Sequence, residues 1–344
     1  MSKNLIFILY DSIYNSVFES QVFQPLIKLI KNNTYQQITI ISFEDFRLKN
    51  IQSPFHPKIN FIFAKKLPFL GKTTLFYPQK QLIKILAKLE FQKIIARGPL
   101  AGFISLKAIQ KLNLKKDLII QARGLCAEEF RFSMKYQNKN LFKKLLQKFI
   151  YKSFKKVEKQ TYSNKYEIFK IESVSDALKE YLVKNFNAKS DKIYIASNDI
   201  PEKINDSQIQ IWKEEIRKQL KIPFNYKVYV YSGSMRPWQC AKESIEYFKN
   251  IHEKNPNTFL LILSKDKNEF EKETEKQKIP KNNFCVLSVK PNEVYKYLSG
   301  ADYGLLFRDK DIINWVSRPT KMLEYQSINL KIIHNDTIEQ LIQE

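Results

Sequence analysis

The chain has 344 residues, 44% of them hydrophobic, and a formal net charge of +23 at pH 7. This length is enough to bury one large or two medium hydrophobic cores, and no apolar run approaches the ~20 residues that a membrane-spanning helix needs. The three cysteines and three histidines have neither metal-ligand nor redox spacing, which excludes a zinc site of ordinary spacing and is consistent with a reducing compartment.

Short β-rich apolar runs alternate with segments of helical periodicity along almost the whole chain. The alternation predicts parallel sheets covered by helices on both faces. The runs predicted as strands are Leu5–Tyr10, Ile38–Phe43, Ile59–Phe63, Lys93–Ala96, Asp117–Gln121, Glu167–Ile171, Lys192–Ala196, Lys227–Tyr231, Thr258–Leu263, Phe284–Leu287, Asp302–Phe307 and Leu330–Ile333. A polar stretch from Ser197 to about Asn225, with a helix predicted at Ser207–Leu220, separates two series of strands. We therefore predict two doubly wound α/β domains, at residues 1–198 and 199–344.

The first apolar run is stopped by Asp11, well short of a signal-peptide core and its cleavage site. We interpret it as a buried strand, and we expect a cytoplasmic protein. A loop follows this strand and leads into a helix predicted at about Val17–Lys31.

Arginine and glycine are scarce, because Lys supplies 50 of the 58 basic residues and only 7 residues are Gly. Average usage would give ~7% Gly. An Arg in such a chain indicates a need for the rigid fork of donors of its guanidinium group. A Gly indicates a backbone position with positive φ, or one that another group approaches closely. Such residues follow four predicted strands, at Arg97-Gly98, Arg123-Gly124, Gly233 to Arg236, and Arg308.

Residues 139–170 form the most basic region, in which lysines alternate with Leu, Phe, Ile and Val at helical spacing. Three interpretations are open. The segment is a helix that lies on an anionic membrane surface, with ~1 kcal/mol contributed per nearby Lys, or a core-packing helix with a solvated lysine face, or a nucleic-acid contact. The preference for Lys over Arg and the lack of a known binding module disfavour nucleic acid.

The second domain opens with a strand that ends at Gly233 and leads into a helix, an arrangement that presents backbone N–H groups to a phosphate. Arg236 adds a bidentate donor. The alternative is a tight turn whose Arg points into water. Further along, Pro319 is predicted at the first position of a helix on which Lys321 and Glu324 share one face. A loop between a strand's carboxyl end and a helix N-terminus is where open α/β sheets bind anionic ligands, although an ordinary crossover has the same pattern.

The pattern Ser317-x-Pro319-Thr320-Lys321-x-x-Glu324-Tyr325, between Ala301-Asp302-Tyr303-Gly304-Leu305 and Leu330-Lys331-Ile332-Ile333, resembles the donor-site signature of glycosyltransferase family 4. That family has the GT-B fold, two Rossmann-like domains facing across a cleft. The chain departs from the common motif at Val316, where many members have a second Glu. It also stops at Glu344, where members usually continue with further elements, so the resemblance suggests a C-terminally truncated copy.

The resemblance implies a retaining, metal-independent hexosyltransferase that uses a nucleotide-diphosphate sugar and no other cofactor. The acceptor would be a saccharide or a lipid-linked saccharide, in cell-surface polysaccharide or glycolipid synthesis, with peripheral contact to the inner membrane face through residues 139–170. Catalysis would rest on Arg236, Lys321 and Glu324, with Glu324 on the ribose hydroxyls and Lys321 facing the diphosphate. The implied donor-binding residues are Gly233, Ser234, Arg236, Ser288, Arg308, Ser317, Pro319, Thr320, Lys321 and Glu324.

On the acceptor side, the resemblance implies Asp11, Ser12, Gln21, Arg97, Gly98, Arg123 and Glu128. For Arg123 a buried ion pair with Glu128 or Glu129 is an equal alternative to binding sugar hydroxyls. Two other functions remain open, an inactive binding or scaffold protein of the same fold and a basic nucleic-acid-binding protein.

Overall fold

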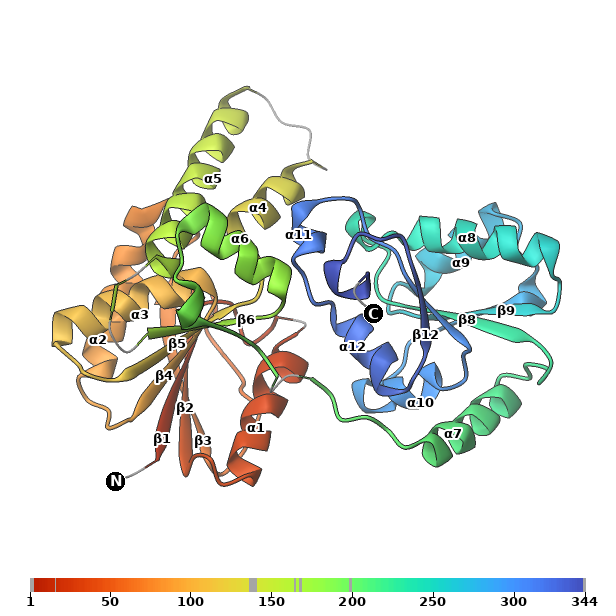
Figure 1. The fold of residues 1–344 in the computed structure, drawn as a ribbon, viewed down its shortest axis with the longest axis horizontal. Helices are drawn as coiled ribbons and strands as arrows, with labels where there is room; N and C mark the ends of the chain where they lie inside the picture. Colours follow the sequence, from red (N-terminus) through yellow and green to blue (C-terminus); the bar gives the residue numbers. More distant parts are fainter. Residues whose placement is uncertain are drawn as a thin grey trace. The chain divides into compact units, whose positions relative to one another are not determined.

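The computed structural model describes residues 3–15, 17–135, 141–163, 165–166, 169–197 and 200–342, and the chain forms two compact units, Met1–Asp199 and Ile200–Glu344. We call these the first and the second domain (Figure 1). Each contains one sheet whose strands are all parallel. No helix in the described ranges is both long enough and apolar enough to cross a membrane.

The first domain has a seven-stranded sheet in the order β3-β2-β1-β4-β5-β6-β7. Its strands are β1 Asn4–Leu9, β2 Gln37–Asp45, β3 Ile59–Lys66, β4 Lys93–Arg97, β5 Asp117–Ala122, β6 Phe169–Ser173 and β7 Ile193–Ile195. Each coincides with a predicted strand to within a few residues, although the first two residues of the run predicted at 167–171 lie outside the described residues. The predicted doubly wound α/β architecture is confirmed for this domain.

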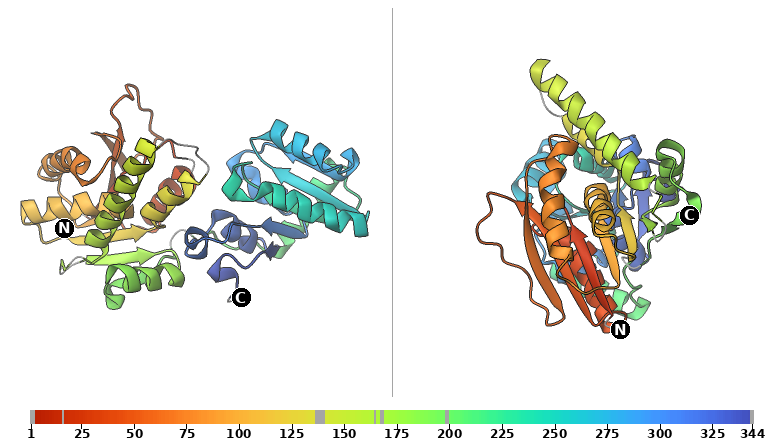
Figure 2. Two further views of the ribbon diagram at one scale, coloured as in Figure 1. Left: turned by 90° about the horizontal axis from the view of Figure 1, so that it is seen from above. Right: turned by 90° about the vertical axis from the view of Figure 1, so that its left-hand side faces the viewer.

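Helices cover both faces of the first sheet (Figures 1 and 2). They are α1 Gln24–Lys31, α2 Phe76–Leu86, α3 Gly98–Leu112, α4 Cys126–Met134, α5 Leu141–Tyr162 and α6 Asp176–Phe186. Successive residues of a strand point to opposite faces. Accordingly Leu5 and Phe7 of β1 pack with Leu26 and Ile30 of α1, whereas Ile120 of β5 faces α3.

The predicted helix at 17–31 begins with a π-helical turn, η1 Glu19–Phe23, before α1 starts. Pro25 stands at the second position of α1 and has no N–H to donate to the preceding turn. The Gln24 N–H bonds the carbonyl oxygen of Glu19, five residues back. A single π turn of this kind is common near functional sites.

The second domain has a five-stranded sheet in the order β10-β9-β8-β11-β12. Its strands are β8 Lys227–Ser232, β9 Thr258–Leu263, β10 Phe284–Leu287, β11 Tyr303–Leu306 and β12 Lys331–His334. Its helices are α7 Asp206–Gln219, α8 Ala241–Lys254, α9 Lys267–Lys276, α10 Val294–Leu298, α11 Ile312–Trp315 and α12 Thr320–Ser327. The strand order reverses direction between β8 and β11, which is the kind of position where open α/β sheets bind ligands.

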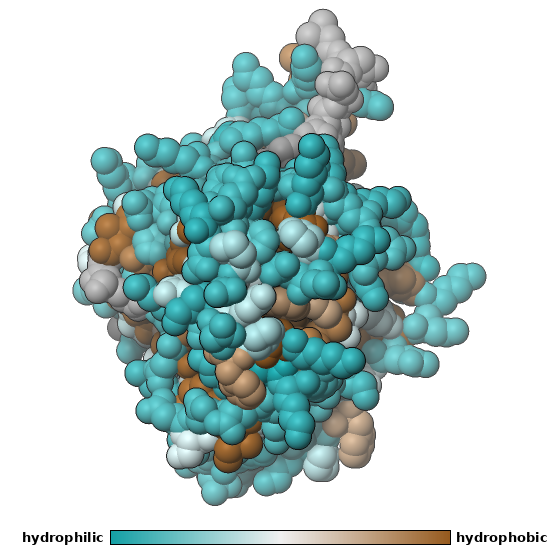
Figure 3. Space-filling view, turned by 90° about the vertical axis from the view of Figure 1, so that its right-hand side faces the viewer, coloured by the Kyte–Doolittle hydropathy of each residue, from teal (hydrophilic) through white to brown (hydrophobic). Residues whose placement is uncertain are grey.

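Two cores cover the two faces of the second sheet. Tyr229 and Tyr231 point to the face covered by α8 and α9, whereas Val228 and Val230 point to the face covered by α10 and α12. The described residues also include the 3-10 segments η2 Lys72–Leu75, η3 Ser190–Lys192, η4 Pro237–Gln239, η5 Lys281–Asn283, η6 Pro291–Glu293 and η7 Glu339–Leu341. Hydrophilic side chains cover most of the face shown in Figure 3, with apolar side chains in small patches between them.

The basic region at 139–170 is described over α5, with residues 139, 140, 164, 167 and 168 outside the described residues. The second half of α5 is core-packing, since Ile150, Val157 and Tyr162 are buried. In the first half Leu145, Leu146 and Phe149 are exposed to 60, 42 and 58%. The core-packing interpretation therefore describes the second half of the helix and leaves the first half unexplained.

Candidate functional site

The turn after β8 is held in a fixed shape by the protein itself. Gly233 has φ +144°, a conformation that L side chains rarely adopt, and its N–H donates to the carbonyl oxygen of Leu263 at 2.9 Å. The Met235 N–H donates to Asp266 Oδ2 at 2.9 Å. Two N–H groups that the sequence analysis expected to face a phosphate are thus used within the protein.

Lys321 lies directly against this turn. A Cβ on Gly233 would come within 2.7 Å of Lys321 Cε and would displace the end of this side chain. The ammonium Nζ is 4.2 Å from the centroid of the Tyr231 ring, a cation–π contact. It is buried and has no hydrogen-bond partner among the residues that the structure describes. Burial, and after it the charge of Arg308, lowers the pKa of Lys321 well below its usual value, while Glu324 opposes this shift.

Glu324 stands one turn further along α12 and is half-buried. Burial raises its pKa to about 7, and the charge of Lys321 acts in the opposite direction. The structure brings Lys321 and Glu324 together as their spacing predicts.

Arg308 follows β11 and is 8% exposed. Its Nη1 donates to the carbonyl oxygens of Gln239 at 3.3 Å and Phe307 at 3.1 Å, so the guanidinium ties the end of β11 to the turn after β8. Burial lowers its pKa. Two basic side chains thus lie with one carboxyl group at this end of the sheet, and we call Arg308, Lys321 and Glu324 the α12 cluster.

Helix α12 is anchored to the neighbouring strands. The Tyr325 hydroxyl accepts the Ser232 N–H at 3.3 Å, and a Cβ on Gly304 would come within 2.6 Å of the Tyr325 ring. Pro319 is the N-cap of the helix and Thr320 its first residue, which corrects the prediction of Pro at the first helical position by one residue. The Ser317 Oγ donates to the Asn314 carbonyl oxygen at 2.8 Å.

Three further predicted donor residues are Arg236, Ser234 and Ser288. Arg236 is exposed, with its guanidinium carbon 5.4 Å above the Trp238 ring. The Ser234 carbonyl oxygen lies 3.0 Å from the Tyr231 hydroxyl. Ser288 follows β10 and is exposed. Val316, where the common motif has Glu, is fully buried and supplies no carboxylate.

On the first domain, the loop after β1 is organised by Glu44, a residue that the sequence analysis missed. Its carboxylate accepts the Ser12 hydroxyl at 2.5 Å, the Ile13 N–H at 2.9 Å and the Ser42 hydroxyl at 2.6 Å. Glu44 is 1% exposed, whereas Asp11 beside it is exposed. Part of the signal was available, since Ser42 lies in the strand predicted at Ile38–Phe43 and Glu44 follows two residues later, on the same face if the strand continues.

Gln21 and Arg97, both predicted on the acceptor side, are in contact. Arg97 Nη2 donates to Gln21 Oε1 at 2.5 Å. Arg97 is the N-cap of α3, and Gly98 follows with φ +80°. The side chains of the η1 turn and of the end of β4 thus meet at the carboxyl edge of the first sheet.

The ion pair predicted between Arg123 and Glu128 or Glu129 is corrected. Arg123 Nη2 pairs with Glu172 of β6 at 3.0 Å, because Gln121 and Glu172 are opposite each other in the register of β5 and β6. Glu128 instead accepts from Arg131 Nε at 2.6 Å and from the Tyr151 hydroxyl at 2.8 Å.

Glu129 approaches the backbone at Gly124, where a Cβ would collide with its carboxylate. Burial, and after it the charge of Asp11, raises the pKa of Glu129.

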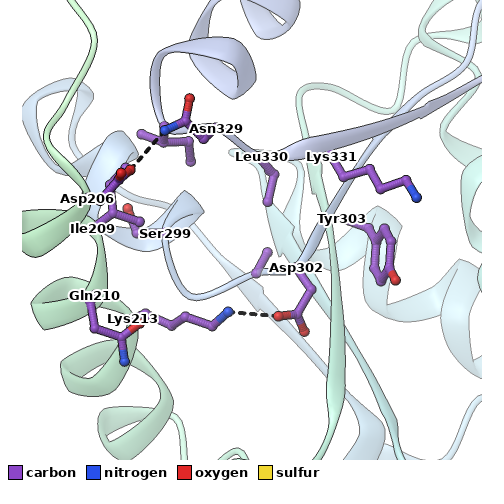
Figure 4. A pocket seen from close by; sticks show the side chains of 12 residues that line it. Asp206, Ile209, Gln210, Lys213, Ser299, Asp302, Tyr303, Asn329, Leu330 and Lys331 are labelled. Atoms are coloured by element: carbon purple, nitrogen blue, oxygen red, sulfur yellow. Dashed lines mark hydrogen bonds and ion pairs between the residues drawn. The ribbon is translucent and has the colours of Figure 1, made fainter.

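A separate hollow in the second domain has a structural explanation (Figure 4). It lies at the amino ends of β11 and β12, the opposite end of the sheet from the α12 cluster. Its central carboxylate, Asp302, pairs with Lys213 at 2.8 Å and Arg217 at 2.8 Å and accepts the Val228 N–H at 2.8 Å. These bonds fasten α7 to the sheet. In the described part of the chain, no group of three or more His, Cys, Asp or Glu has an arrangement that would hold a metal ion.

Comparison with known proteins identifies the fold. Residues 212–309 match the family model described as glycosyl transferases group 1, a segment that includes Gly233, Arg236 and Arg308 and ends before Lys321 and Glu324. No curated protein matches the chain in sequence.

Solved structures resemble the chain over nearly its whole length. A glycosyltransferase from Rickettsia africae has 13% identity and a TM-score of 0.62 over 98% of this chain and 80% of its own. Sucrose-phosphate synthase from Thermosynechococcus elongatus has 12% identity and a TM-score of 0.66 over 99 and 83%. Anabaena HepE in complex with UDP and glucose has 12% identity and a TM-score of 0.63 over 100 and 83%. The predicted resemblance is confirmed at this level: the chain has the GT-B fold, and its residues 212–309 carry the sequence pattern of the glycosyl transferases group 1.

Proposed function

We propose that the protein is a glycosyltransferase that takes a sugar from a nucleotide-diphosphate sugar bound to its second domain. The observation that carries the proposal is the α12 cluster, in which the Lys321 ammonium is buried beside Gly233 with no partner among the described residues. Burying a cation without a hydrogen-bond partner is unfavourable. An anionic ligand at the carboxyl ends of β8 and β11 would supply that partner. The HepE structure, which holds UDP and glucose, supports a nucleotide-sugar donor.

The residues of the α12 cluster, together with Arg236, suit different parts of such a donor. Lys321 offers three N–H donors to a diphosphate, and Arg236, on the same turn as Gly233, offers a bidentate fork. The Glu324 carboxylate is an acceptor for the ribose hydroxyls. Arg308 is engaged with backbone carbonyls, so we propose that it shapes the turn and adds positive charge instead of binding the donor directly.

We propose retention of configuration without a metal ion. The chemistry would come from placing donor and acceptor together and from Lys321 and Arg236 taking up the charge that develops on the leaving diphosphate. This mechanism follows from the family resemblance and from the basic side chains at the carboxyl ends of β8 and β11. No nucleophile is proposed, so departure and attack would occur on one face of the sugar.

The acceptor would bind to the first domain, at the carboxyl edge formed by Asp11, Gln21, Arg97 and Gly98. A saccharide or lipid-linked saccharide, in cell-surface polysaccharide or glycolipid synthesis, fits the family resemblance. Asp11 and the Gln21–Arg97 pair offer acceptors and donors for sugar hydroxyls. Peripheral contact with an anionic membrane through the basic region at 139–170 is part of this proposal.

The test is calorimetric titration of the full chain with a panel of UDP-, GDP-, ADP- and dTDP-sugars. We expect at least one donor to bind, and Glu324→Ala to lose most of that affinity. The matched control is Glu246→Ala, which removes an exposed Glu from α8 and should bind as the wild type. Equal donor affinity in the Glu324→Ala variant would contradict the proposed site. Failure of the wild type to bind any donor would favour an inactive scaffold, and steeply salt-dependent RNA binding with no donor response would favour a nucleic-acid binder.

A further inference from the structure

A hollow at the carboxyl edge of the first sheet lies beside the residues to which we assign the acceptor. The ends of three strands form it, since Tyr10 and Asp11 follow β1, Asp45 ends β2 and Lys66 ends β3. Its volume is about 370 Å³, within the ~300–1,000 Å³ of small-molecule sites. We call it the Tyr10 hollow. Tyr10 and Lys66 have no role in the site described above.

One wall of the Tyr10 hollow is apolar. It consists of Leu67, Pro68 and Phe69, from the loop after β3, and Leu100 of α3. Leu67 is 40% exposed, and the Phe69 ring is fixed by stacking on Phe154 of α5, with the centroids 4.1 Å apart. Ligand sites combine apolar walls of this kind with a few polar groups that fix the orientation of the ligand.

The other wall is charged but balanced. Its charged side chains are two acids, Asp11 and Asp45, and two bases, Arg47 and Lys66. Arg47 donates to both carboxylate oxygens of Asp45, at 2.8 and 2.6 Å, and Lys66 has three carboxylates as charged neighbours. In a chain with a net charge of +23, this balance disfavours a phosphate or another anion. It favours a neutral ligand whose hydroxyls can bond donors and acceptors alike.

A buried hydroxyl on this hollow lacks a partner. Tyr10 is 5% exposed, and its hydroxyl oxygen has no hydrogen-bond partner among the residues that the structure describes. The ring stacks on Phe43 with the centroids 5.7 Å apart. Lys66 Nζ donates to the Tyr10 carbonyl oxygen and lies 5.0 Å from the ring centroid. Leaving a buried hydroxyl unpaired is unfavourable, and a ligand hydroxyl would supply the partner.

Asp11 joins the Tyr10 hollow to the acceptor edge. It lines the hollow, and its charge acts on Glu129 of α4, on which the charge of Arg97 also acts. Arg97 in turn donates to Gln21. The first domain therefore offers two adjacent places for sugar rings, one on the acceptor edge and one in the hollow, with Asp11 between them.

We infer that the acceptor contains at least two sugar units. The unit that receives the transferred sugar lies on the edge at Asp11 and Arg97, and a neighbouring neutral unit occupies the Tyr10 hollow, with its less polar face on the apolar wall. The inference rests on the proposed function and names the class of its acceptor, an oligosaccharide instead of a monosaccharide. Tyr10 and Lys66 are then specificity-determining residues, because they contact the second unit and not the reacting one.

The first experiment is calorimetric titration of the full chain without donor. The probes are methyl glycosides of glucose, galactose, mannose and N-acetylglucosamine, each as the monosaccharide and as disaccharides of the same sugar. We expect at least one disaccharide to bind at least about tenfold more tightly than its monosaccharide. Glucose 6-phosphate should bind no more tightly than methyl glucoside, because the hollow has no surplus positive charge.

Two variants locate the gain in the Tyr10 hollow. Lys66→Met should remove the disaccharide gain, and Tyr10→Phe should weaken disaccharide binding about threefold to tenfold, both with unchanged monosaccharide affinity. Tyr10→Phe deletes a hydroxyl that is unpaired in the described structure, so its Tm should not fall. The matched control is Lys65→Met, which removes an exposed Lys on the opposite face of β3 and should bind every probe as the wild type does.

The second experiment measures transfer from the best-binding donor to the same pair of acceptors. We expect a lower KM for the disaccharide, which Lys66→Met and Tyr10→Phe raise at unchanged kcat, whereas Asp11→Asn raises the KM for both acceptors. Equal binding of mono- and disaccharides across the panel, no binding of any probe, or a gain that survives both variants would overturn the inference while donor binding stands. A disaccharide gain in a protein that binds no donor would instead overturn the proposed function.

Discussion

The substitution Lys321→Met should make the ligand-free protein more stable and unable to bind its donor. Lys321 Nζ is buried with no hydrogen-bond partner among the described residues and shares its surroundings with Arg308, a second cation. Leaving a polar group buried and unpaired costs ~1–3 kcal/mol, and Met retains most of the stem's shape without the ammonium group. We therefore expect a gain of about 1–3 kcal/mol in the free energy of unfolding, or roughly 3 to 9 °C in Tm.

The assay is paired, with thermal or urea unfolding of the ligand-free chain and calorimetric titration with the donor that binds best. Lys272→Met, which removes an exposed Lys of α9, is the matched control and should change neither quantity by a measurable amount. Opposite signs for stability and donor affinity are the signature of a residue retained for ligand binding. A Lys321→Met variant that is less stable than the wild type by ~1 kcal/mol or more, or that binds donor normally, would refute the reasoning.

Three further predictions concern single residues. Because burial raises the pKa of Glu324 to about 7, the contribution of this group to stability is fully present below about pH 4.5 and is lost as the pH rises to 7. Glu324→Gln should abolish this loss of stability, worth about 2–3 kcal/mol, in unfolding measured as a function of pH. In the wild type, donor affinity should rise between pH 6 and 8 as Glu324 ionises, and in Glu324→Gln it should stay constant. Gly233→Ala should cost ~1–3 kcal/mol from its positive φ and displace Lys321, which unfolding and donor titration would show together; unchanged donor affinity would contradict the close contact. Glu172→Ala should destabilise the first domain by ~1–3 kcal/mol in urea unfolding, since it removes the carboxylate that accepts from Arg123, Gln121 and Tyr194; no measurable loss of stability would show that these bonds are not structural.

The strands and their grouping were predictable because buried parallel strands are almost continuous apolar runs. Twelve such runs were predicted, and strands lie at each of them. Lys321 and Glu324 were also predictable as neighbours, since three residues along a helix always return to one face.

Side-chain pairs between strands were not predictable, because they depend on register. Arg123 meets Glu172 only because β5 and β6 align Gln121 with Glu172, and no local pattern in the sequence fixes that alignment. The exposure of the first half of α5 depends likewise on where the helix crosses the domain. Helical periodicity alone does not show how much of an amphipathic helix is covered.

The most direct measurement of the central claim is a crystal structure of the full chain with its best-binding nucleotide sugar. The account predicts the diphosphate within hydrogen-bond distance of Lys321 Nζ, about 3 Å, and the ribose hydroxyls on the Glu324 carboxylate, beside Gly233. A nucleotide found instead at the amino ends of β11 and β12, in the hollow around Asp302, would contradict it.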